Sequence, residues 1–138
     1  MAGSRAWPAR LALAEAVRRA APGAWRPAAA WPSGETFGRQ VRSVWRREAR
    51  LLGRYLSTRF FACWALFQGG GLRSHVAWTR LVLDTLAVEA ARRAAAAGGP
   101  LDTAGLLEAI SETDRRLLHL ADPERLVRGL EARAGQAR

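Results

Sequence analysis

The stretch FGRQVRSVWRREARLLGRYL, residues 37–56, decides the fold class because its apolar and its charged residues both recur at helical spacing. At 100° per residue the apolar side chains gather on one side of a helix. They are Val41, Val44, Trp45, Leu51, Leu52, Tyr55 and Leu56. The opposite side carries Arg39, Arg42, Arg46, Arg50 and Arg54, with Arg47 beside them. The pattern predicts one helix with a packing face and a cationic face about 22 Å long.

Apolar residues and helix boundaries predict further helices on both sides of this stretch. Pro8 is a suitable first residue for a helix over 8–21. The Pro- and Gly-rich residues from about 22 to 38, with Trp25 and Trp31 as bulky anchors, predict a loop. Residues 60–67 are apolar almost all round, as expected for a buried central helix that ends at the Gly69–Gly71 triplet.

The C-terminal half of the sequence also predicts helices. A helix over 72–97 should pack through Val76, Leu83, Leu86 and Ala90 and stop at residues 98–100. Asp102 or Thr103 should cap the next helix, which runs through Leu106, Leu107 and Ile110. Residues 122–124, Asp-Pro-Glu, are a typical helix start. No segment alternates as a strand does, so we predict a single all-α domain over 1–138, a compact bundle of five or six helices.

Charge is unevenly distributed along the chain. The formal net charge is +10, and every basic residue is Arg. Through Arg93, 16 arginines face five acids, a net +11, whereas the remainder carries −1. Codon bias accounts for Arg in place of Lys, but not for the excess of positive charge. A local positive field is typical of proteins that bind polyanions, and a membrane surface or an acidic protein would also be attracted.

The sequence offers no constellation for catalysis. His75 and His119 lie 44 residues apart, without a nucleophile signature around Ser74 or Cys63. One cysteine and two distant histidines do not make a zinc site. We interpret Glu112 and Asp114 as solvated capping acids and the glycine triplet as a turn. We therefore expect no enzyme activity, no metal and no cofactor.

The arginines are the candidate functional residues, because Glu48 is the only acid among them and cannot neutralise them all. Their contacts to phosphates would give affinity that depends on salt and not on sequence. The alternative is a solvated face that binds nothing. The candidate nucleic-acid-binding residues are Arg39, Arg42, Arg46, Arg47, Arg50, Arg54, Arg59, Arg73 and Arg80.

Two segments resemble the small helical subunit of type III-B CRISPR effector (Cmr) complexes. The first runs from Tyr55-Leu-Ser-Thr-Arg59 through Gly71-Leu72 to Ala77-Trp78, and the second from Leu107 to Leu126. The resemblance implies a non-catalytic subunit in antiviral defence, which packs against copies of itself along a guide–target duplex. It also implies RNA and other subunits of a ribonucleoprotein as partners.

Two other functions remain open from the sequence. A basic DNA-binding or regulatory protein would have the same charge asymmetry, but no helix-turn-helix can be placed convincingly. A helical adaptor for an acidic protein is the third possibility. The apolar runs are too short for a membrane span, and no secretory signal is recognisable, so we expect a cytoplasmic protein. Trp25 and Trp31 in the loop predict self-association or docking onto a larger complex.

Overall fold

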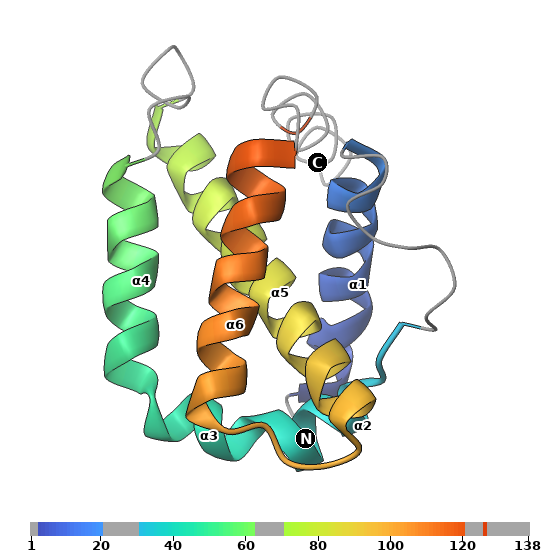
Figure 1. Cartoon of the computed structure of the whole chain (residues 1–138). Helices are drawn as coiled ribbons and strands as arrows, with labels where there is room; N and C mark the ends of the chain where they lie inside the picture. The colour runs from blue at the N-terminus through green and yellow to red at the C-terminus, as the bar shows by residue number, and fades with distance from the viewer. Residues whose placement is uncertain (1–2, 21–30, 63–70, 121–125, 127–138) are drawn as a thin grey trace.

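Helix α5, Gly71–Ala97, runs through the middle of the molecule and contacts α1, α4 and α6 (Figure 1). The computed structural model describes residues 3–20, 31–62, 71–120 and 126. Within these residues all regular structure is helical, which confirms the predicted all-α class. The other elements are α1 (Gly3–Ala20), α2 (Gly34–Thr36), the π-helical turn η1 (Phe37–Val41), α3 (Arg42–Arg47), α4 (Ala49–Ala62), α6 (Thr103–Asp114) and the π-helical turn η3 (Arg115–Leu120).

The buried central helix of the described residues is α5, and residues 60–62, the described part of the predicted 60–67 segment, end α4. Buried positions surround α5 between Leu81 and Ala94. Many of them are alanines, which let neighbouring helices approach closely, whereas Phe61 is 76% exposed. The predicted core face of α5 is correct at Leu86 and Ala90, but Val76 is exposed. Residues 63–70 lie outside the described part of the chain.

Helix α1 begins at Gly3, five residues before the predicted start. Pro8 therefore lies inside the helix, where its missing amide hydrogen removes one backbone bond. Trp7, next to it, is buried: its ring packs 5.5 Å from that of Phe37, and its Nε1 donates to the Pro32 carbonyl at 2.9 Å. These partners are distant in sequence, so helix signals near residue 8 could not reveal them.

The predicted loop over 22–38 ends earlier than expected. Ser33 caps α2, since its Oγ accepts a hydrogen bond of 3.1 Å from the Thr36 amide. Gly34 lies against Trp7, where an added Cβ would be 3.0 Å from the indole Cγ. Trp31 is partly buried and packs against the core, so its side chain does not support the docking predicted from the two loop tryptophans. Trp25 falls outside the described residues.

The predicted helix over 37–56 is broken at Glu48. Glu48 has φ −95° and ψ 24°, and α4 rises from the end of α3 in a new direction (Figure 1). The Thr103 hydroxyl donates to Glu48 Oε1 at 2.9 Å and accepts from Arg47 Nη2 at 3.1 Å. The Leu101 amide also donates to the Gln40 carbonyl at 2.8 Å. Contacts with the α5–α6 connection therefore stabilise the change of direction at Glu48, which we call the corner at Glu48.

The connection from α5 to α6 follows the sequence prediction. Gly98 ends α5 with a φ of 71°, which favours glycine. Asp102 caps α6 by accepting a 2.7 Å hydrogen bond from the Gly105 amide. The predicted helix start at 122–124 lies outside the described residues, but Leu126 beyond it is buried.

Candidate nucleic-acid interface

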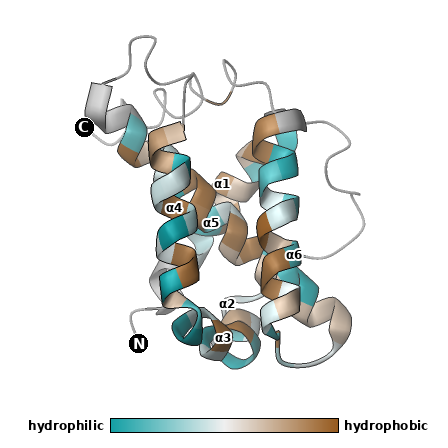
Figure 2. Cartoon of the chain, turned by 60° about the vertical axis from the view of Figure 1, so that its left-hand side comes forward, coloured by the Kyte–Doolittle hydropathy of each residue, from teal (hydrophilic) through white to brown (hydrophobic). Residues whose placement is uncertain are grey.

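The arginines of the predicted cationic face are exposed, but they lie on three elements, with Arg39 on η1. Arg42 and Arg46 belong to α3, and Arg50 and Arg54 belong to α4. The single straight face of about 22 Å is therefore wrong, because the chain changes direction at Glu48. Hydrophilic and apolar residues still alternate along α4, as Figure 2 shows. Periodicity predicted which arginine side chains face outward. The contact between Thr103 and Glu48 determines the directions of the two helices that carry them.

On α3 and α4, four exposed arginines have no carboxylate within 4.0 Å among the described residues. They are Arg42, Arg46, Arg50 and Arg54, and we call them the α3–α4 arginine surface. Two neighbours are paired. Arg39 forms an ion pair with Glu35, and Arg47 lies 3.3 Å from Glu48. The positive charge of this corner is thus concentrated in the four unpaired guanidinium groups.

Arg59 is engaged inside the protein and does not belong to this surface. Its Nη2 donates to Asp114 Oδ2 at 2.7 Å, and its guanidinium lies 5.6 Å from the Tyr55 ring centroid. The Tyr55 hydroxyl donates to Asp114 Oδ1 at 2.8 Å. Burial, followed by the hydrogen bond to Asp114, raises the pKa of Tyr55. Asp114 thus joins α6 to α4, so its interpretation as a solvated capping acid is wrong.

The remaining two candidates lie on α5. Arg80 is exposed and has no carboxylate within 4.0 Å in the described residues, although its charge acts on Asp84. Burial raises the pKa of Asp84, against the opposite effects of Arg10 and Arg80. The Arg73 side chain lies outside the described part of the structure. Neither residue can be placed on the α3–α4 arginine surface.

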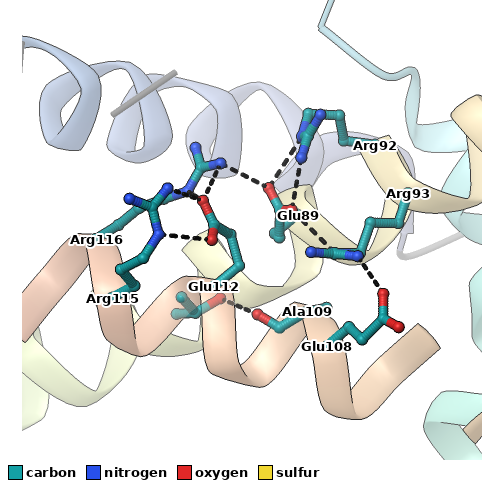
Figure 3. Close-up of polar contacts among 9 residues, drawn as sticks. Glu89, Arg92, Arg93, Glu108, Ala109, Glu112, Arg115 and Arg116 are labelled. Atoms are coloured by element: carbon teal, nitrogen blue, oxygen red, sulfur yellow. Dashed lines mark hydrogen bonds and ion pairs between the residues drawn. The ribbon is translucent and has the colours of Figure 1, made fainter. Parts of the chain in front are cut away.

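In the described residues, the most extensive pairing of arginines with acids lies where α5 meets α6 and η3 (Figure 3). Glu89 is completely buried. Its carboxylate oxygens lie 2.8 Å from a guanidinium nitrogen of Arg92, 3.1 Å from one of Arg93 and 3.5 Å from one of Arg116. Arg116 is only 3% exposed and also contacts Glu112 at 2.7 Å. This network joins α6 and η3 to the central helix.

Glu112 makes part of this network sensitive to acid. Its hydrogen bond to Arg115, with help from Arg116 and against the effect of burial, lowers its pKa from 4.5 to about 2. Because the folded pKa is below the unfolded one, the stabilisation is complete above about pH 5 and is lost as the pH falls toward 2. We expect the stability advantage of the wild type over Glu112→Gln to shrink by roughly 2 kcal/mol between pH 6 and pH 3.

Urea unfolding at both pH values, followed by circular dichroism, measures this change. Glu108→Gln is the control, because Glu108 is 67% exposed and, among the described residues, forms an ion pair with Arg93 alone. An equal acid dependence of the wild type and Glu112→Gln would contradict the assignment.

The described residues contain no group of three or more His, Cys, Asp or Glu side chains that could hold a metal ion. His75 lies on α5, with its ring 5.3 Å from that of Phe60. Cys63 lies outside the described residues. The feature that sequence reasoning missed is the exposed Phe61, whose seven-residue spacing from Arg54 places it on the same face of α4.

Comparisons with protein-family models, with curated proteins and with solved structures return no match for the chain. None of the helices in the described part of the chain is long and apolar enough to cross a membrane.

Proposed function

We propose that this chain binds the phosphate backbone of nucleic acid through the α3–α4 arginine surface, without catalysing a reaction on it. The observation that carries the proposal is the contrast in pairing. Carboxylate partners are present for the described arginine side chains of α1 and η3 and for Arg92 and Arg93 of α5, whereas Arg42, Arg46, Arg50 and Arg54 have none among the described residues. Exposed guanidinium groups without internal partners are available to bind phosphates in bidentate geometry.

The corner at Glu48 favours backbone binding over insertion of a recognition helix. Arginines four residues apart on one helix are separated by about 6 Å of rise, so each of the two helices offers one pair. α3 has only six residues and is separated from α4 by Glu48 alone. A helix-turn-helix needs a turn of three or four residues before a helix that enters the major groove. This part of the chain therefore suits contacts that follow phosphates.

The proposal predicts a large loss of binding when the unpaired arginines are removed. Arg42→Ala, Arg46→Ala and Arg50→Ala in one chain should lower the slope of log K against log salt by about 2 for single-stranded RNA. At 0.1 M salt the affinity should fall roughly 100-fold. Fluorescence anisotropy with a labelled oligonucleotide, repeated at several salt concentrations, measures both quantities.

A charge-matched variant separates position from net charge. Arg18→Ala, Arg19→Ala and Arg115→Ala also remove three positive charges, but from arginines that are paired with Glu15 and Glu112. Its salt slope should stay close to that of the wild type. Because the proposal includes no catalysis, the RNA should also be recovered intact from all reactions. Equal losses in the two triple variants, or unchanged binding by the first, would refute the proposed interface.

A narrower proposal is that the chain is a subunit of an RNA-guided effector complex. It is supported by the resemblance over residues 55–78 and 107–126, and by the helical fold with a basic surface. Self-association and contacts with other subunits belong to this narrower proposal. The binding test above does not depend on them.

A further inference from the structure

Phe61 extends the α3–α4 arginine surface along α4 with an exposed aromatic ring. Phe61 is seven residues beyond Arg54, which is about 10.5 Å of rise and about 20° around the helix. It is 11 residues beyond Arg50, again about 20° away. With 76% of its surface exposed, Phe61 stands in the same stripe as the two unpaired arginines of α4.

The ring of Phe61 contacts the neighbouring ring of Phe60, and much of the Phe61 ring remains accessible. The Phe60 ring meets it edge-on, with centroids 5.3 Å apart and an interplanar angle of 86°. Phe60 is in turn 5.3 Å from the His75 ring on α5. This chain of ring contacts ties the end of α4 to the central helix, while Phe61 remains outermost.

The surface between the arginines and Phe61 carries only small side chains. Ser57 and Thr58 are exposed, and the Thr58 hydroxyl is turned back to the Arg54 carbonyl at 2.9 Å. Gly53 has no atom within 4 Å of the position of an added Cβ. A strand that follows the arginines can therefore reach Phe61 without meeting a bulky side chain of this face.

We propose that this stripe binds single-stranded nucleic acid, with phosphates held by Arg50 and Arg54 and one base stacked on Phe61. The inference rests on the proposed function and adds to it a preference for unpaired strands. Bases of a duplex are already stacked on one another, whereas those of a single strand offer their faces to an aromatic ring. Stacking adds affinity without sequence preference, because every base has such a face.

The test compares strands that have equal charge but differ in bases. The probes are a 15-nucleotide oligouridylate and an abasic oligonucleotide of the same length. The wild type should bind the first about tenfold more tightly than the second, within the range of one stacked base. Phe61→Ala and Phe61→Leu should lose this preference while their salt slopes remain unchanged, and Phe61→Trp should keep it. Leu107→Ala, at another exposed apolar residue, is the matched control and should keep it too.

Failure of this inference is distinguishable from failure of the proposed function. Equal affinity of the wild type for the two oligonucleotides, or full preference in Phe61→Ala, would overturn stacking even if the arginine variant still lost its salt slope. Unchanged binding by the arginine variant would overturn the phosphate-binding surface itself and with it the assigned role of the stripe. Circular dichroism of each variant verifies that the helices are retained.

Discussion

Replacing Glu89 by Gln is expected to lower the free energy of unfolding by about 3 kcal/mol. The substitution keeps the shape of the side chain but removes the negative charge that faces Arg92, Arg93 and Arg116. Breaking a buried ion pair leaves uncompensated charge in a poorly solvated place. The expected loss lies at the lower end of the range for such pairs, because Arg93 keeps Glu108 and Arg116 keeps Glu112.

Urea unfolding at pH 7 measures the loss. Glu108→Gln should cost less than about 1 kcal/mol, as usual for an exposed pair. Adding Arg116→Met to Glu89→Gln should recover part of the stability, because it removes a charge that is 3% exposed. A Glu89→Gln protein as stable as the wild type would show that the network at the α5–α6 junction does not hold the bundle together.

The second large effect is expected from Trp7→Ala, which should destabilise the protein by about 3–5 kcal/mol. Trp7 is 6% exposed and links α1 to the start of the arginine-bearing segment through Phe37, Gly34 and the Pro32 carbonyl. Alanine would remove the packed indole together with its hydrogen bond. The resulting cavity would lie between α1 and the α2–η1 segment.

Trp7→Phe is the matched variant, since it keeps an aromatic ring but has no Nε1 donor. It should cost about 1–3 kcal/mol, mainly by leaving the Pro32 carbonyl without its partner. Thermal and urea unfolding of both variants give the comparison. If Trp7→Ala were no less stable than Trp7→Phe, packing of α1 on Phe37 would contribute little to the fold.

Local pattern was enough for the fold class and for the direction of the arginine side chains. Helical periodicity over residues 37–56 separates Val44 and Leu52, which are buried, from Arg42 and Arg50, which are exposed. Caps are equally local, so Asp102 was predictable as the start of α6. Such features depend on residues within a turn or two of each other, and a sequence displays these neighbours directly.

The sequence could not show which arginines form ion pairs with which acids, because that depends on which helices pack together. Arg59 and Arg54 look equivalent along the chain, yet Asp114, 55 residues after Arg59, takes Arg59 out of the candidate surface. Phe61 is apolar, as core residues usually are, but it lies exposed on the outer face of α4.

The sequence by itself determined an all-helical chain with an outward row of arginines. Only the tertiary structure decided that this row bends at Glu48, which of its members remain unpaired, and that α5 is the central helix. The physical reason is that these outcomes depend on contacts between distant segments, such as Thr103 with Glu48 and Arg116 with Glu89. Neither periodicity nor capping carries information about which distant side chains will face each other.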